Sequence, residues 1–474
     1  MEYALPVVIA IIALGSVWIS SNARTEGAFF RGQSADGKAP GLLTLTFSQV
    51  TTWVFARSLM NAAILGFYYG IWGTLAYAAY YLSFLTGGRI IDSLRFEHGY
   101  DSVQAFLRQR FGRWGTGCYN LVVAIRLISE VFANLLVIGL LFGVAGGQGY
   151  TLAILGFALV TLCYSMLGGL HASLKTDLYQ MWIFLAVLVL LLGFTLFSGQ
   201  FSFSDLLFVP FEFDQPGPIL LLVALLQVWS YPMHDPVMMD RGFLADRENT
   251  RRSFSHAAWI SSLCITGFGV LGVLAGAHAD NGESMNAALM RLLGDLPMLV
   301  FNVALVVSAM STLDSTLSSS AKLVAVDMAI LRGSVRNGRT VMLLFVVLGL
   351  ACVFLGNKDL FSAVAVSGTA SMYLAPVIFF SLWGKRRDIP VWSYLTSFVL
   401  AVGGAMLYFF ESSGYSGLLG DAHKYTKLLW ISLTVLSGGC LAFWIGGAIN
   451  KFGGRAADLD GTGETDTALE SAAG

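Results

Sequence analysis

Long apolar segments recur along almost the whole chain, and they restrict its possible folds more than any other feature of the sequence. A helix needs about 20 predominantly apolar residues to cross the hydrocarbon core of a bilayer. Of the 474 residues 56% are hydrophobic and only 12% are charged. This composition argues against a soluble globule, and the sequence predicts an all-α integral membrane protein.

A window of about 19 residues predicts about 13 transmembrane helices. We expect them near residues 3–20, 42–65, 67–87, 117–143, 151–167, 177–198, 218–239, 256–277, 298–327, 340–356, 360–383, 391–410 and 427–449. Arg and Lys gather in alternate loops, among them the loop after residue 239 with Arg241, Arg247, Arg251 and Arg252, whereas the loops on the other side keep only Arg291, Lys358, Lys424 and Lys427. Because cytoplasmic loops are enriched in basic residues, we expect a cell-membrane protein with its N-terminus outside and its C-terminus in the cytoplasm.

The remaining composition predicts one domain without enzymatic chemistry. Residues 1–454 are expected to form a single transmembrane domain, and the acidic segment 455–474, which lacks aromatic residues, a disordered cytoplasmic tail. The five cysteines show no metal-ligand spacing, and there is no G-x-S-x-G, H-E-x-x-H or phosphate-loop pattern. We therefore expect a protein that is not an enzyme, with the bilayer as a partner, and neither nucleic acid nor an obligatory protein partner.

Ionisable residues are rare inside the predicted spans, where each is costly and usually faces a cavity or a partner. Arg126 and Glu130 are four residues apart, so both lie on one face of a helix. One interpretation is a buried ion pair within the bundle, and the other is that Arg126 binds a carboxylate of a substrate while Glu130 orients it. The ionisable residues in the spans are Arg57, Arg126, Glu130, Asp177, His234, Asp235, Asp314 and Lys322.

A polar stripe runs along the segment 308–322, whose remaining residues are mostly apolar. Its members recur at intervals of three and four residues, so they share one helix face: Ser308, Ser311, Thr312, Ser315, Ser318, Ser319 and Lys322. Asp314 adds a carboxylate to this segment. Close helix packing by small hydroxyl residues is one interpretation. Neutral and anionic oxygens together also suit a desolvated small cation.

The segment WSYPMHDP, residues 229–236, places two prolines inside one apolar span. Each proline removes a backbone hydrogen bond and clashes with the preceding turn, so we expect a discontinuous helix. Broken helices near the midplane expose carbonyls and helix ends to substrates and ions. The alternative is a simple proline kink without ligands.

Four segments, in order, resemble motifs of the sodium:solute symporter family. They are YSMLGGLHASLKTDLYQ (164–180), SYPMHDPVMMDRGFLADRENTRRS (230–253), SAMSTLDSTLSSSAKLVAVDM (308–328) and LAPVIFFSLWGKR (374–386). The resemblance covers roughly residues 40–390 and implies two inverted five-helix repeats, the leucine-transporter type of fold. The repeats would be 42–198 and 218–383, with one N-terminal helix (3–20) and two C-terminal helices (391–410 and 427–449) at the periphery.

The resemblance also implies ion sites. The family's common sodium site corresponds here to the carbonyls of Phe47, Val50 and Ser308 and the hydroxyls of Ser311 and Thr312. A second site, present in some members, corresponds to Asp177, Ser311, Asp314 and Ser315. Asp314 departs from the serine of those members, and the extra carboxylate is expected either to strengthen cation binding or to carry a proton. Residues 44–58 contain no Gly or Pro, so unwinding of this first core helix rests on the resemblance alone.

The resemblance implies a sodium-coupled secondary active symporter that works by alternating access. Its solute is expected to be small, polar and organic, and the two arginines in the spans favour a carboxylate such as an amino acid or organic acid. A proton-coupled transporter and a transporter-like membrane sensor are the alternatives. The candidate substrate-binding residues are Gln49, Thr51, Thr52, Arg57, Tyr68, Arg126, Trp229, Tyr231 and His234, with Glu130 as a supporting partner of Arg126.

Overall fold

The computed structural model describes all residues except 1–3, 21, 35, 356–366 and 461–474, and in this part of the chain every regular element is a helix. The helices in chain order are α1 (Ala4–Ile19), α2 (Glu26–Arg31), α3 (Leu42–Trp53), α4 (Ala56–Ala79), η1 (Tyr80–Leu82), α5 (Ser83–Ile91), η2 (Asp92–Glu97), α6 (Val103–Phe142), α7 (Gln148–Phe197), η3 (Phe203–Leu207), α8 (Pro216–Gln227), α9 (Tyr231–His234), α10 (Pro236–Gly242), α11 (Arg247–Ala277), α12 (Met285–Leu293), α13 (Asp295–Lys322), η4 (Leu323–Asp327), α14 (Val335–Leu355), α16 (Leu374–Pro376), η5 (Val377–Trp383), α17 (Val391–Ser412) and α18 (Lys424–Asp460).

The all-α, multi-pass membrane architecture is confirmed. Among the described residues, 8 helices or continuous helical runs are long and apolar enough to cross a membrane, and α1 and α8 are shorter apolar helices. The expected spans 151–167 and 177–198 are joined in α7, whose backbone leaves the helical conformation at Gly169 (φ 53°). Part of the expected span 360–383 lies outside the described residues. The number of crossings and the two repeats stay predictions.

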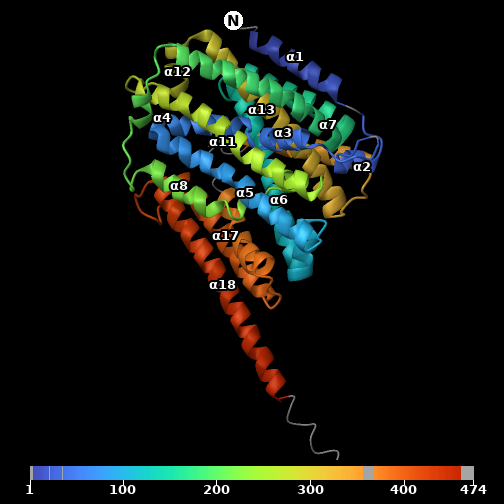
Figure 1. Cartoon of the computed structure of the whole chain (residues 1–474). Coiled ribbons are helices and arrows are strands. Elements are labelled where there is room, and N and C mark those ends of the chain that lie inside the picture. Colours follow the sequence, from blue (N-terminus) through green and yellow to red (C-terminus); the bar gives the residue numbers. More distant parts are fainter. Residues whose placement is uncertain (1–3, 21, 35, 356–366, 461–474) are drawn as a thin grey trace, which may run out of the picture.

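The core is a bundle in which α4 lies against α8 and α11, and α13 lies against α6 and α7 (Figure 1). Small residues allow the closest approach, as is common between membrane helices. A Cβ atom added to Gly272 of α11 would lie 1.8 Å from the carbonyl oxygen of Ala63 in α4. The two backbones therefore touch at this point, and no larger residue fits there.

The last two helices lie at one side of the bundle. α17 and α18 pack against each other, α18 also contacts α8, and its far end extends beyond the bundle (Figure 1). α18 continues to Asp460, six residues into the segment 455–474 that was expected to be a disordered tail. Residues 461–474 lie outside the described residues, and the division into one transmembrane domain and a tail stays a prediction.

The helix break predicted in the segment WSYPMHDP is confirmed. α8 ends at Gln227, the short α9 includes Pro232, and α10 starts at Pro236. Two carbonyls at this break accept hydrogen bonds from other helices: that of Val228 from the Thr86 hydroxyl (2.6 Å) and that of Met233 from the Tyr119 hydroxyl (2.9 Å). A buried carbonyl without a partner costs free energy comparable to a lost hydrogen bond. These donors therefore stabilise the interruption that the prolines start.

A second break separates α3 from α4, although the sequence has no Gly or Pro there. Val54 (φ −84°, ψ 67°) and Phe55 (φ −91°, ψ 162°) leave the helical conformation. The Ser308 hydroxyl of α13 donates to the Val54 carbonyl, and the Tyr81 hydroxyl donates to the Trp53 carbonyl at 2.7 Å. Tertiary donors thus stabilise this break. The break lies four residues beyond Val50, and the Val50 carbonyl still accepts a helical hydrogen bond from the Val54 amide at 2.8 Å.

Candidate functional site

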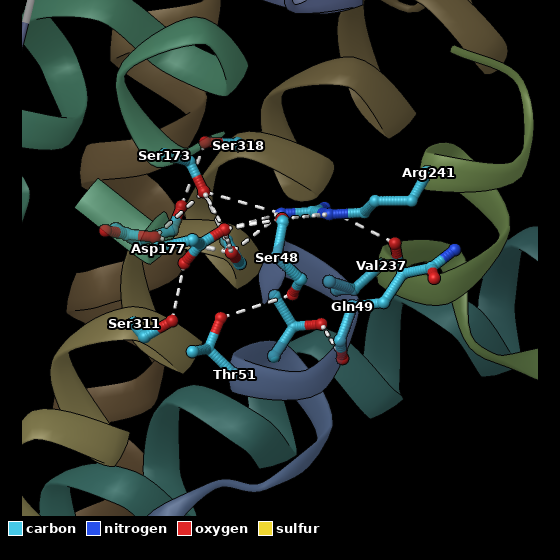
Figure 2. Close-up of polar contacts among 12 residues, drawn as sticks. Ser48, Gln49, Thr51, Ser173, Asp177, Val237, Arg241, Ser311 and Ser318 are labelled. Carbon is cyan, nitrogen blue, oxygen red and sulfur yellow. Dashed lines mark hydrogen bonds and ion pairs between the residues drawn. The ribbon is translucent and has the colours of Figure 1, made fainter. Parts of the chain in front are cut away.

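Asp177 of α7 is the centre of a fully buried polar cluster. The Ser311 hydroxyl of α13 donates to its Oδ1 at 2.5 Å, and the Ser48 hydroxyl of α3 donates to its Oδ2 at 2.6 Å. Nη2 of Arg241 in α10 lies 3.7 Å from the same Oδ2. Four helices thus meet at one carboxylate, as Figure 2 shows.

Asp314 lies beside this cluster and shares its hydroxyl groups. Its Oδ1 accepts a hydrogen bond from Ser173 at 2.9 Å, and its Oδ2 accepts one from Thr176 at 2.8 Å. The hydroxyls of Ser173 and Ser315 are 2.8 Å apart, and each lies 3.4 Å from Asp177 Oδ2. The structure therefore brings the predicted second-site residues together.

Thr312 connects the same face of α13 to the break after α3. Its hydroxyl lies 3.0 Å from the carbonyl oxygen of Ser308 and 3.3 Å from that of Thr51. The carbonyls of Phe47 and Val50, predicted as ligands, accept hydrogen bonds within the Leu42–Val54 segment, from the Thr51 hydroxyl (2.9 Å) and the Val54 amide (2.8 Å). The α3 carbonyl that faces Thr312 is thus the Thr51 carbonyl.

A second buried cluster surrounds the break between α9 and α10. Nη2 of Arg126 lies 2.8 Å from Glu130 and also forms an ion pair with Asp235, and Nη1 donates to the Tyr231 hydroxyl at 2.9 Å. Nε2 of His234 lies 3.1 Å from the Ser367 hydroxyl. Because Arg126 already contacts two carboxylates, these contacts favour the ion-pair interpretation over a guanidinium that is free for a substrate.

Other buried polar groups lack hydrogen-bond partners among the described residues. The Nε and Nη1 atoms of Arg57 are buried without a hydrogen bond, and so are both amide atoms of Gln49. Buried polar groups are almost always hydrogen-bonded, so each exception calls for an explanation such as a ligand. The Arg57 guanidinium stacks on the ring of Phe55. Phe55 is one of the residues that line a small cavity, with Trp53, Ser58, Tyr77, Tyr80, Tyr81 and Tyr231.

Comparison of the sequence with known proteins gives one partial match. No family model matches the chain. The high-affinity choline transporter 1 of Torpedo marmorata is 27% identical over 188 residues, which are 38% of this chain and 32% of that protein. The aligned part is thus about a third of that relative's length.

Two solved structures match over nearly the whole length. A substrate-bound, outward-open Na⁺-coupled sialic acid symporter aligns with a TM-score of 0.68 at 14% identity, over 94% of this chain and 98% of that chain. A nucleobase-cation-symport-1 family transporter, Mhp1, in a closed conformation aligns with a TM-score of 0.56 at 15% identity, over 91% and 96%. This chain has the leucine-transporter-type fold. The fold that the four motifs imply is thereby confirmed, and the proteins named above are all transporters rather than enzymes.

Some predicted residues do not join either cluster of this leucine-transporter-type fold. Tyr68 of α4 is 63% exposed, and Trp229 is 41% exposed and packs on Phe379. The hydroxyls of Thr51 and Thr52 bond back to carbonyls of their own helix. The two aromatic side chains are thus more exposed than the residues of the two clusters, and their role in substrate binding stays a prediction.

The structure also adds residues that the sequence did not suggest. Arg241 was counted in a cytoplasmic loop, but α10 continues to Gly242 and its guanidinium is fully buried in the Asp177 cluster. Ser48, Ser173 and Thr176 complete that cluster. Asp235 was recognised only as a charge inside a span. The sequence does contain a signal for the burial of Arg241, because this residue follows Pro236 by only five positions. A helix that starts again at Pro236 still lies inside the protein when it reaches Arg241.

Proposed function

We propose that the chain is a secondary active transporter that couples the entry of Na⁺ to that of a small polar organic solute by alternating access. The observation that carries this proposal is the cluster of hydroxyl and carbonyl oxygens that joins α13 to the break after α3. The Na⁺-coupled sialic acid symporter with the same fold supports it. One Na⁺ moving inward through about 100 mV supplies about 2.3 kcal/mol before any concentration gradient is counted.

The proposed Na⁺ ligands are the hydroxyls of Ser311 and Thr312 and the carbonyl of Ser308. In α3, the carbonyl of Thr51 lies closest to Thr312, and those of Phe47 and Val50 become available if the helix opens one turn earlier. Hard oxygen ligands suit a hard cation. Because these oxygens belong to two helices, bound Na⁺ favours the conformation in which α3 and α13 are together, and this preference couples the ion to the conformational change.

The proposed solute carries a carboxylate. Arg57 supplies a buried guanidinium with unpartnered N–H groups, and a guanidinium pairs well with a carboxylate. Gln49 supplies neutral hydrogen bonds, and Tyr231 and its aromatic neighbours supply apolar walls with polar ends. Choline, the solute named for the Torpedo relative, is a cation that the charge of Arg57 would repel. Sialic acid, the solute of the structural neighbour, is an acid and fits this proposal better.

We also propose that the N-terminus lies outside and the C-terminus in the cytoplasm, because Arg and Lys concentrate in one set of loops. Arg241 is not one of these loop residues, since its side chain is buried. Arg247, Arg251 and Arg252 follow it in the same segment, so the asymmetry remains. Cysteine-accessibility labelling of intact cells at residue 358 and at residue 336 would distinguish the two orientations.

The experiment that tests the transport proposal has two steps. First, the purified full chain is heated in NaCl or in KCl with single amino acids, organic acids, sialic acid or choline, since a ligand raises thermal stability by mass action. A carboxylate should stabilise the protein in NaCl and not in KCl. Second, uptake of that solute into proteoliposomes should require an inward Na⁺ gradient. Uptake driven by a pH gradient without Na⁺ would show proton coupling, and binding without uptake would favour a sensor.

A further inference from the structure

The guanidinium of Arg241 lies at the place where the family resemblance implies a second cation. It extends from α10 into the space between α3, α7 and α13 (Figure 2). Nη2 donates to the Ser315 hydroxyl at 2.7 Å and to the Ser173 hydroxyl at 3.4 Å. Nε donates to the Ser48 hydroxyl at 3.1 Å, and Nη1 donates to the Val237 carbonyl at 3.3 Å.

We propose that Arg241 is a built-in cation that replaces the second Na⁺, so that the transporter binds a single Na⁺. The guanidinium contacts two of the four expected ligands of a second Na⁺: Ser315 at 2.7 Å and Asp177 at 3.7 Å. The part of the proposal that counts Na⁺ ions rests on the proposed function. The part that assigns the guanidinium as counter-cation of this site does not depend on it.

The charges around the site support this assignment. Asp177 and Asp314 are fully buried, and a buried carboxylate is stable only when it is paired or hydrogen-bonded. Among the described residues, Arg241 is the only basic side chain with an ion pair to either of them. Lys322, the other basic residue of the stripe on α13, instead pairs with Asp240 at 2.5 Å and Asp327 at 3.4 Å. An arginine keeps its charge in proteins, so the compensation is permanent.

A tethered cation differs from Na⁺ in its consequences for transport. Na⁺ leaves a site when the surrounding helices separate, whereas Arg241 stays attached to α10. Its charge is therefore not delivered across the membrane, and this site adds nothing to the number of ions moved in one cycle. The guanidinium also holds α10, the helix after the proline break, against α7 and α13 whether or not Na⁺ is present in the medium.

The test uses the purified full chain and its Arg241→Ala variant. Equilibrium binding of radioactive Na⁺ should give one ion per wild-type chain and two per variant chain. The variant should lose thermal stability in Na⁺-free buffer, because two carboxylates remain without a cation. Added NaCl or low guanidinium chloride should restore that stability. Choline chloride at equal ionic strength should not, because its trimethylammonium group is too large for the site and has no N–H donor.

Further variants keep the outcome decisive. Arg241→Ala combined with Asp314→Asn removes one charge of each sign, so this double variant should fold in Na⁺-free buffer even if the single variant does not. Arg241→Lys, which keeps the charge, should still bind one Na⁺.

The possible failures can be told apart. A wild type that binds two Na⁺, or a single variant whose stability ignores both Na⁺ and guanidinium, would overturn the assignment, and so would a double variant that cannot fold. A wild type that binds no Na⁺, together with a variant that gains one, would instead contradict the proposed function and leave the assignment of Arg241 intact.

Discussion

Thr312 provides the sharpest test of the proposed Na⁺ site. Its hydroxyl, 3.0 Å from the Ser308 carbonyl and 3.3 Å from the Thr51 carbonyl, is nearly inaccessible to solvent. Thr312→Val removes the hydroxyl and keeps the shape of the side chain. Polar interactions with a charged group contribute about 1.5–3 kcal/mol, and about 1.4 kcal/mol corresponds to a factor of ten in affinity. We therefore expect the Na⁺ concentration for half-maximal response to rise by roughly 10- to 150-fold.

The assay is the Na⁺ dependence of thermal stability of the purified protein, followed by the Na⁺ dependence of solute uptake. Thr316→Val is the matched control, because Thr316 is equally buried one turn further along α13 and its hydroxyl contacts Glu130 at 3.3 Å instead. The control should leave the Na⁺ dependence unchanged, and Thr312→Ser should retain most of it. An unaltered Na⁺ dependence in both Thr312→Val and Ser311→Ala would refute the reasoning.

Three further predictions concern other parts of the molecule. Arg126→Met should lower the free energy of unfolding by about 3–5 kcal/mol, since it leaves buried carboxylates unpaired, and adding Glu130→Gln should recover part of the loss in a denaturation assay. Arg57→Gln should weaken binding of a carboxylate solute at least tenfold, about 1.4 kcal/mol, with unchanged Na⁺ binding; equal weakening for a neutral solute would contradict this role. Arg386, 2.7 Å from Asp388 in the loop before α17, lowers the pKa of that carboxyl. The pair therefore stabilises the fold above the ordinary aspartate pKa of about 3.9 and loses this contribution as the pH falls through the lowered value. Asp388→Asn should cost less than about 1 kcal/mol at pH 7 and nothing at a pH below the lowered pKa, measured by thermal unfolding against pH.

The sequence by itself determined the features that depend on local chemistry. Apolar length places the membrane helices, because the thickness of the bilayer sets the length of each span. Pro232 and Pro236 interrupt their helix whichever helices surround it, since each proline removes a backbone hydrogen-bond donor. The helical period places Ser308, Ser311 and Thr312 on one face of α13 without knowledge of its neighbours.

Only the tertiary structure decided the features that depend on partners distant in the chain. The break at Val54 has no local cause and persists because Ser308 and Tyr81 supply donors to the released carbonyls. Arg241 follows a span and precedes a basic loop, so its sequence context matches that of a cytoplasmic residue. Its burial is decided by the carboxylate of Asp177, 64 positions earlier, which lies in reach only after α7 and α10 have packed against α3. A local pattern cannot encode such a pair, because the free energy that stabilises it comes from charges and hydroxyls that meet only in the folded bundle.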